Sequence, residues 1–262
     1  MTVQTVGWLL RDWRHRRGLS QLDLAIAADV SARHISLVET GRSRPSADMV
    51  LRLAAELEVP LRERNRLLLA AGHAPRYRQR PLDASGMSAV RDAVVRVLTA
   101  HEPYPAVVFD RHWNIVMTNR VADSFLAGAA EDLTTQPVNM VRLALAPGEL
   151  ASRIVNHADV RAFFRSRLAR QLARTGDPVI AALYEEFFAD EAPDEFTAVV
   201  ESDVIIPMII RHGDHELSLF STVTTFGTPQ DITLEEISVE SYYPADERTA
   251  AILKGFPGVA TI

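Results

Sequence analysis

The chain has 262 residues, of which 47% are apolar and 24% charged, with a formal net charge of -6 and no cysteine. This size and composition fit a globular protein with room for two cores, and they exclude fibrous proteins and disulfide-rich scaffolds. No apolar run is long enough to cross a bilayer and no secretory signal peptide is recognisable, so we expect a cytoplasmic protein.

Charge is distributed unevenly along the chain. Residues 1–82 contain 14 arginines and 8 acidic residues, a net charge of +6, whereas the remainder contains 14 basic and 26 acidic residues, a net charge of -12. A basic part joined to a larger acidic part predicts that only the first part approaches a polyanion such as DNA. Chance scatter of surface charge is the alternative.

The first 72 residues predict five short helices. Apolar residues recur at helical spacing, and the helices are expected to begin near Val6, Ser20, Ser31, Ser46 and Leu61, with the three serines as N-caps. A turn of a few residues joins the second helix to the third. This is the helix-turn-helix arrangement, which places the second helix of the pair in the major groove of DNA.

Two segments of this region, Ser20–Ala25 and Val30–Ser46, resemble the XRE family of phage repressor and Cro DNA-binding domains. The resemblance covers about residues 5–72 and implies binding to double-stranded DNA. The family often has glycine at the place of Asp29, in a left-handed turn that aspartate also tolerates. By position, the resemblance implies that DNA is contacted by Gln21, Ser31, Ala32, Arg33, His34, Ser36, Leu37, Arg42 and Arg44.

The resemblance also implies individual roles, which side-chain chemistry supports. Arg33 is expected to read a base edge, since a guanidinium can bond guanine in bidentate fashion, and Arg42 and Arg44 are expected to hold phosphates. Gln21 would reach a phosphate or buttress the recognition helix, and the alternative is a solvated surface residue. For Arg44 the alternative is an ion pair with Glu39.

A linker is expected at residues 75–84, between a DNA-binding domain at 1–74 and a second domain at 85–262. Prolines bracket this stretch and favour an extended backbone, in which alternate side chains project to one side. Three arginines alternate in it, Arg76, Arg78 and Arg80. They either contact DNA phosphates or belong to a solvated linker.

The second domain combines helices and strands. Periodicity and turn chemistry predict a helix around 90–98, a hairpin of Ala106–Phe109 and Ile115–Thr118, a helix capped by Asn119, and helices at Val160–Arg174 and Pro178–Phe188. Three further strands are expected at Val204–Ile210, Glu216–Phe226 and Ile237–Tyr242. The sequence thus predicts an all-α N-terminal domain and an α+β C-terminal domain, whose five-stranded antiparallel sheet has helices against one face. The order of the elements in this second domain resembles a PAS-like fold.

Several runs of the second domain resemble the MmyB-like ligand-binding domain of actinobacterial regulators. They are Asp110–Arg120, Val138–Arg142, Ile154–Asn156, Ser218–Thr222 and Glu240–Ala250. The resemblance covers about residues 85–255 and implies a pocket for a fatty-acid-like molecule. One departure is Leu145–Gly148, where relatives often carry histidine before the proline.

An elongated apolar ligand would lie between the sheet and the helices. The expected contacts are Trp113, Asn119, Phe125, Phe164, Leu168, Leu183, Phe187, Phe220 and Thr222. A carboxylate head would need a desolvated cation or donor, for which Arg142, Asn156 and Arg167 are the candidates. The alternative for each apolar residue is an ordinary core position.

The sequence therefore predicts a DNA-binding transcription regulator that acts as a homodimer on an inverted repeat and responds to a small apolar ligand. The alternative is an adaptor whose helix-turn-helix domain binds a protein. Enzymatic motifs such as a phosphate-binding glycine loop, HExxH or GxSxG do not occur, and no cofactor is expected. The run His212–His215 has metal-binding residue types but is expected to be a hairpin turn.

Overall fold

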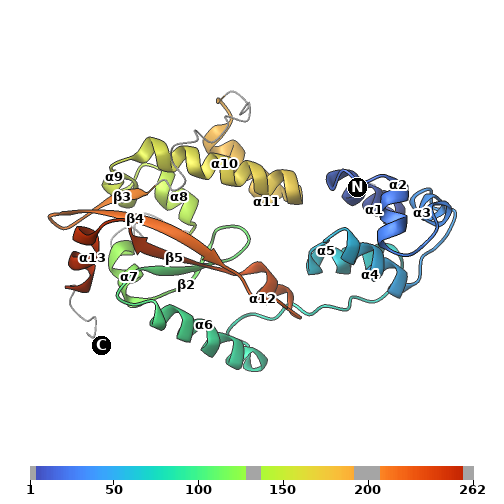
Figure 1. Ribbon diagram of the computed structural model, residues 1–262, viewed down its shortest axis with the longest axis horizontal. Helices are drawn as coiled ribbons and strands as arrows, with labels where there is room; N and C mark the ends of the chain where they lie inside the picture. The colour runs from blue at the N-terminus through green and yellow to red at the C-terminus, as the bar shows by residue number, and fades with distance from the viewer. Residues whose placement is uncertain (1–3, 128–136, 192–206, 256–262) are drawn as a thin grey trace. The chain divides into compact units, whose positions relative to one another are not determined.

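The computed structural model describes residues 4–127, 137–191 and 207–255. Contacts divide the chain into two compact units, which are drawn in Figure 1. The first is Met1–Pro81 together with Gly227–Glu235, and the second is Leu82–Phe226 together with Glu236–Ile262. The first unit thus includes a short segment from far along the chain, which the sequence did not indicate.

Five helices build most of the first unit. They are α1 (Val6–Arg16), α2 (Gln21–Ala27), α3 (Ala32–Glu39), α4 (Ala47–Glu56) and α5 (Leu61–Ala70). The predicted caps are confirmed, because the hydroxyls of Ser20, Ser31 and Ser46 each accept a hydrogen bond from a backbone N–H in the first turn of the following helix. Asp29 has a φ of 51°, the left-handed turn that the resemblance implied.

Helix α1 crosses the end of α3 at very short range. A Cβ atom built on Gly7 would lie 2.4 Å from the backbone oxygen of Val38 and 2.7 Å from that of Glu39. Only a residue without a side chain fits this crossing, because the atoms that it meets are backbone and cannot turn aside. The position of α3 against α1 therefore depends on a glycine.

Residues 227–235 are bound to the segment that the sequence predicts as a linker. The carboxylate of Asp231 is buried and accepts a 2.8 Å hydrogen bond from Arg80, while the N–H of Ile232 donates to the carbonyl of Arg78. Glu235 accepts a hydrogen bond from the N–H of Leu61 at 2.7 Å. This contact caps α5, whose N-cap residue is a proline without a capping side chain.

The second unit contains the predicted five-stranded antiparallel sheet. Its strands are β1 (Ala106–Phe109), β2 (Ile115–Thr118), β3 (Met208–His212), β4 (His215–Thr224) and β5 (Ser238–Pro244), in the order β2-β1-β5-β4-β3. Strand β3 begins just after Pro207, a residue that lacks the N–H needed for a ladder hydrogen bond. The predicted strand residues 204–206 lie outside the described residues.

The helices of this unit are α6 (Ser88–Ala100), α7 (Arg120–Leu126), α8 (Met140–Leu145), α9 (Glu149–Arg153), α10 (His157–Thr175), α11 (Pro178–Phe188) and α13 (Glu247–Lys254), with a 3-10 turn at Ser85–Met87. Helix α12 (Ile232–Glu236) belongs, except for its last residue, to the first unit. The sequence did not predict α8, α9, α12 or α13. Each has eight residues or fewer, so its apolar pattern extends over about two turns at most.

Helices cover both faces of the sheet, so the expectation of one covered face was wrong. Helices α8 to α11 lie on one side and α6 lies on the other (Figure 1). The side chains of β5 alternate between the two faces, with Glu240 and Tyr242 on the first and Tyr243 on the second. His101, which follows α6, contacts the ring of Tyr243 at a centroid distance of 4.7 Å.

We predict that Gly7→Ala destabilises the first unit by about 1–3 kcal/mol, although alanine normally favours a helix, because α1 and α3 must move apart. Amide hydrogen exchange of α1 and α3 measures the effect. Gly227→Ala is the control, since a Cβ there meets nothing within 4 Å. Equal exchange in both variants would show that the crossing imposes no constraint.

Candidate DNA interface and ligand pocket

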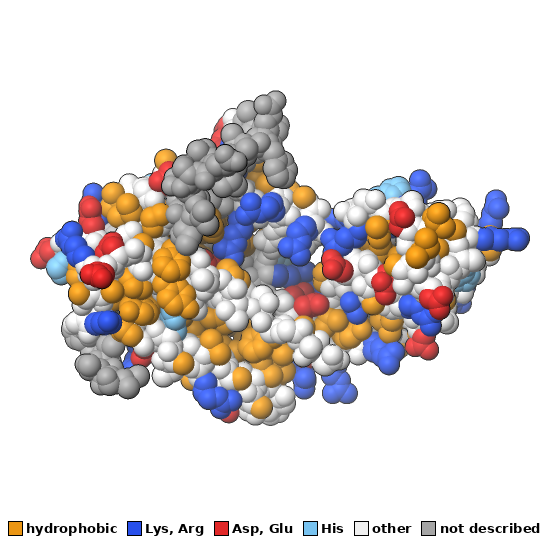
Figure 2. All heavy atoms as spheres, viewed as in Figure 1, with side chains coloured by type: hydrophobic (Ala, Val, Ile, Leu, Met, Phe, Trp, Pro, Cys, Tyr) orange, Lys and Arg blue, Asp and Glu red, His pale blue; other side chains and the backbone are white. Residues whose placement is uncertain are grey.

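Helix α3 presents a polar outer face and buries its inner face. Ile35 and Val38 are each 1% exposed, whereas Arg33 is exposed and Ser36 and Leu37 are half-buried. Arginine side chains stand out from the surface of the helical unit, at the right in Figure 2. The inner face of α3 is therefore buried, and Arg33 on its outer face is accessible to solvent.

A buried ion pair holds α3 against α1 and α2. Arg14 of α1 donates two hydrogen bonds to the carboxylate of Glu39, at 2.7 and 3.0 Å, and their side chains are only 8% and 3% exposed. Gln21 of α2 donates to the same carboxylate at 2.9 Å. Arg14 also donates to the carbonyl of Leu19, so the guanidinium joins α1, the turn before α2 and the end of α3.

The network decides how Glu39 titrates. Burial alone would raise the pKa of Glu39, but the hydrogen bonds from Arg14 and Gln21 outweigh it and hold the pKa below its ordinary value. The stabilisation that Glu39 contributes is therefore present above the ordinary glutamate pKa and is lost as the pH falls through the lowered one.

The structure places the other predicted DNA-contacting residues on or near α3. Ser31 caps the helix, Ala32 and His34 lie half-buried in its first turn, and Arg42 is exposed in the loop that follows. Gln21 has the buttressing position that was one of its two expected roles. Arg44 does not pair with Glu39, because its Nε donates to the carbonyl of Ala71 at the end of α5.

We predict that Arg14→Met costs about 3–5 kcal/mol of stability in the first unit, because it leaves a buried carboxylate without its partner. The double variant Arg14→Met/Glu39→Met removes both charges and is expected to cost clearly less than the sum of the single variants. Amide hydrogen exchange of α1 and α3 gives both values. Strict additivity of the two substitutions would contradict the coupling.

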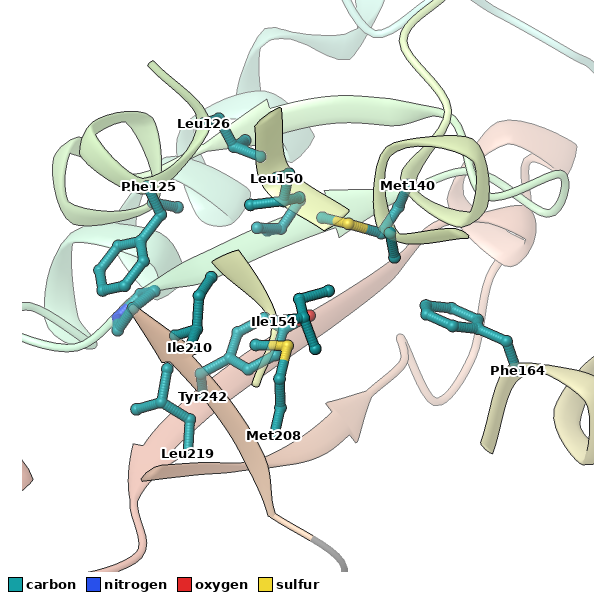
Figure 3. A pocket seen from close by; sticks show the side chains of 14 residues that line it. Phe125, Leu126, Met140, Leu150, Ile154, Phe164, Met208, Ile210, Leu219 and Tyr242 are labelled. Carbon is teal, nitrogen blue, oxygen red and sulfur yellow. The ribbon is translucent and has the colours of Figure 1, made fainter. Parts of the chain in front are cut away.

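A small apolar cavity lies between the sheet and the helices of the second unit. Its volume is about 60 Å³, and 14 side chains line it (Figure 3). The strands contribute Val107, Met208, Ile210, Leu219 and Tyr242, and the rest are Pro105, Ala122, Phe125, Leu126, Met140, Ala144, Leu150, Ile154 and Phe164. An engineered cavity of about 150 Å³ holds benzene, so this space in its present form fits only a few heavy atoms.

Two of the predicted ligand contacts, Phe125 and Phe164, line this cavity. Four others belong to the hydrophobic cluster around it without lining it: Trp113, Leu168, Leu183 and Phe187. Phe220 and Thr222 lie on the opposite face of the sheet, where the Phe220 ring stacks on Tyr243 at 5.4 Å. Asn119 lines a different hollow, of about 270 Å³, and its side chain caps α7.

The three residues expected to bind a carboxylate do not line the cavity. Arg142 is half exposed and forms a bidentate ion pair with Glu186. Asn156 donates to the carbonyl of Pro207 and accepts from the N–H of Ile209. Each of these polar groups is engaged by a neighbour in the fold.

Arg167 is held within the protein by two kinds of contact. Its guanidinium lies 3.4 Å from the buried carboxylate of Glu240 and 4.4 Å from the centre of the Trp113 ring. Trp113 has a φ of 70°, which a bulky residue rarely adopts, and its Nε1 donates to Gln171. The geometry of Trp113 thus serves the packing of α10 against the hairpin of β1 and β2.

Several residues that line the cavity were not predicted from the sequence, among them Met140, Leu150, Ile154, Met208 and Tyr242. The first three lie on or beside α8 and α9, two helices that no repeating apolar pattern in the sequence indicated. Tyr242 carried a usable signal, because it belongs to the predicted last strand, two residues after Glu240 on the same face.

The run His212–His215 forms the predicted hairpin turn between β3 and β4. His212 stacks on Phe125 at 4.5 Å and lies 3.0 Å from Arg153. Burial, followed by the charge of Arg153, lowers the pKa of His212. Within residues 4–127, 137–191 and 207–255, no three His, Asp or Glu side chains are grouped to hold a metal ion, and no helix is long and apolar enough to cross a membrane.

Comparison with known families assigns both units. A model described as a helix-turn-helix domain matches residues 5–67. The model of the MmyB-like transcription regulator ligand binding domain matches residues 90–255, more than half of the chain. The chain belongs to the MmyB-like transcription regulators. This MmyB-like regulator therefore has a helix-turn-helix DNA-binding domain and a ligand-binding domain, and its family is one of regulators, not of enzymes.

Solved structures are similar to this MmyB-like regulator only remotely. The PAS domain of Bordetella pertussis BvgS is 13% identical, with 63% of this chain and 93% of that chain covered and a TM-score of 0.28. An RNA-binding light-oxygen-voltage receptor is 12% identical, with 94% and 61% covered and a TM-score of 0.29. These TM-scores are too low to support an inference about the structure or function of this chain. No curated protein matches the chain.

Proposed function

We propose that this MmyB-like regulator binds an inverted-repeat operator as a cytoplasmic homodimer and that a small, apolar, fatty-acid-like ligand modulates its DNA binding. The observation that carries the proposal is the fixed position of α3, whose exposed face bears Arg33 while the buried Arg14–Glu39 pair holds its end. A rigid helix with an exposed guanidinium near its start suits insertion into a major groove.

The roles of the DNA-facing residues follow from their positions. Arg33 reads a base edge, and Arg42 and Arg44, in the loop after α3, hold phosphates. Gln21 supports α3 through Glu39. The remaining contacts come from the exposed and half-buried positions of α3 and its cap, which are Ser31, Ala32, His34, Ser36 and Leu37.

A homodimer fits the size of this surface. One helix-turn-helix domain contacts a short half-site and makes few base contacts, so a second copy is needed for tight and specific binding. Two copies related by a two-fold axis require an inverted repeat, with half-sites about one helical turn, roughly 34 Å, apart.

The cavity of the second unit supports the ligand part of the proposal. Its lining is almost wholly apolar, as a site for an alkyl chain requires. Met140 and Met208 stand in its wall, and methionine side chains adapt readily to a guest. A chain longer than a few atoms enters only as such side chains move.

The path from the ligand to the DNA-binding unit runs through strands β4 and β5. Leu219 of β4 and Tyr242 of β5 line the cavity. The connection between these strands contains Gly227–Glu235, the segment that belongs to the first unit and caps α5. A shift of β4 or β5 around a ligand is thereby transmitted along the chain to residues that hold α5 and the arginines after it.

We predict that Arg33→Ala lowers discrimination between operator and random duplex by about 1–3 kcal/mol. Arg42→Ala, its matched control, weakens binding to all sequences alike and lowers the salt slope by about 1, because it removes a phosphate contact. Fluorescence anisotropy over a range of salt concentrations measures both, with an operator selected from a random pool.

Two results would contradict the proposal. Equal losses on operator and random duplex for Arg33→Ala would show that this residue does not read bases. Binding to duplex DNA without any salt dependence would favour the adaptor alternative, in which the helix-turn-helix domain binds a protein.

A further inference from the structure

The segment that follows α5 is bound along that helix. Asn65, in the middle of α5, accepts hydrogen bonds from the N–H groups of Arg76 and Tyr77, at 2.9 and 3.0 Å, and donates to the carbonyl of Tyr77 at 2.7 Å. The chain reverses at Gly72, which has a φ of 75°, and runs back beside α5 (Figure 1). The start of the predicted linker is therefore a fixed part of the first unit.

Two hydrogen bonds join the end of α5 to the loop that precedes α4. The ring Nε2 of His73 donates to the carbonyl of Pro45 at 3.0 Å, and the Nε of Arg44 donates to the carbonyl of Ala71 at 2.9 Å. The same loop carries Arg42, which is exposed. The start of the linker and the proposed phosphate-binding loop therefore lie at the same end of α4.

Arg76 of the linker reaches the first turn of α4. Its guanidinium lies 3.6 Å from the carboxylate of Asp48, and the two side chains are 64% and 93% exposed. An ion pair this exposed contributes little stability, because water screens both charges. Arg76 can therefore turn to a phosphate at small cost, and its charge offsets the repulsion between Asp48 and a DNA backbone.

The three arginines of the predicted linker differ in what holds them. Arg80 donates to the buried carboxylate of Asp231 at 2.8 Å, so its charge is used within the first unit. Arg78 forms a parallel backbone bridge with Asp231. Among the contacts of the described residues, it is the pair with Asp48 that places a linker guanidinium beside α4, and that guanidinium belongs to Arg76.

We propose that Arg76 holds a DNA phosphate beside the one that Arg42 holds, so that the start of the linker extends the DNA interface beyond the helix-turn-helix motif. The partner is the phosphate backbone of double-stranded DNA, which is recognised by charge and not by sequence. Asn65 is a positioning residue, because it fixes the backbone of Arg76 before DNA binds. The inference rests on the proposed function, in which the loop after α3 faces the phosphates.

The test measures binding of the full chain to a duplex of random sequence over a range of salt concentrations, because the salt slope counts the phosphates that the protein neutralises. Arg76→Gln removes one charge, and Arg76→Lys keeps it. Arg96→Gln is the matched control, since Arg96 is an exposed arginine of α6 in the second unit. Asn65→Ala keeps the charge of Arg76 and removes the groups that fix its backbone. Arg42→Ala tests the neighbouring phosphate contact.

We expect Arg76→Gln to lower the salt slope by about 1, as Arg42→Ala does, and Arg76→Lys and Arg96→Gln to leave it unchanged. Asn65→Ala is expected to weaken binding about threefold to tenfold with an unchanged slope, because the segment must then be ordered on binding. Ethylation interference on the selected operator maps the phosphate contacts. It is expected to lose one site in Arg76→Gln, adjacent to the site that is lost in Arg42→Ala.

The outcomes separate this inference from the proposed function. An unchanged slope in Arg76→Gln together with a lowered slope in Arg42→Ala would overturn the role of Arg76 and leave the proposed function standing. If neither substitution changes the slope, the loop after α3 does not face DNA, and the proposed function fails together with the inference. An equal loss of slope in Arg96→Gln would also overturn the inference, because the effect would then follow net charge and not a contact.

Discussion

The buried ion pair between Arg14 and Glu39 is the interaction on which the DNA-binding unit depends. A charge is costly inside a protein unless it is paired and hydrogen-bonded, and here both conditions are met by side chains from three helices. The geometry leaves little freedom, because the guanidinium fork, the carboxylate and the amide of Gln21 must meet at one point. Gly7 allows α1 to lie close to α3, and this pair holds the end of α3, the proposed recognition helix, against α1 and α2.

The second unit uses the two faces of one sheet differently. One face contributes to the apolar cavity, which Tyr242 lines, while Arg167 and Glu240 form an ion pair outside the lining. On the other face, which α6 covers, Tyr243 and Phe220 are stacked. Since successive residues of a strand alternate between faces, Tyr242 and Tyr243 have different surroundings although they are neighbours in sequence.

Much of the fold could be read from the sequence because local signals were strong. Serine caps, a left-handed Asp29 and periodic apolar residues located the five helices of the first unit, and alternation located the strands. The sequence could not show that Gly227–Glu235 joins the first unit, because its contacts with Arg78, Arg80 and Leu61 span about 150 to 170 residues of chain. The cavity was also only partly predicted, since α8 and α9 are too short to carry a period.

Side-chain chemistry alone predicted the wrong residues for the polar end of the ligand site. Arg142, Asn156 and Arg167 were reasonable candidates for a carboxylate, since a cation among apolar residues attracts an anion. Each of them has an internal partner, Glu186, the backbone near β3, or Glu240, and pairs of this kind cannot be recognised without the fold. The general lesson is physical: buried polar residues more often satisfy one another than wait for a ligand.

Occupation of the cavity is expected to change the affinity of the helix-turn-helix unit for DNA. The most direct measurement is the dissociation constant of the full chain for its selected operator, at fixed salt, with and without an apolar ligand at a concentration that calorimetry shows to fill the cavity. We expect a change of at least about fivefold, the lower end of ordinary allosteric coupling. An unchanged dissociation constant with a filled cavity would contradict it.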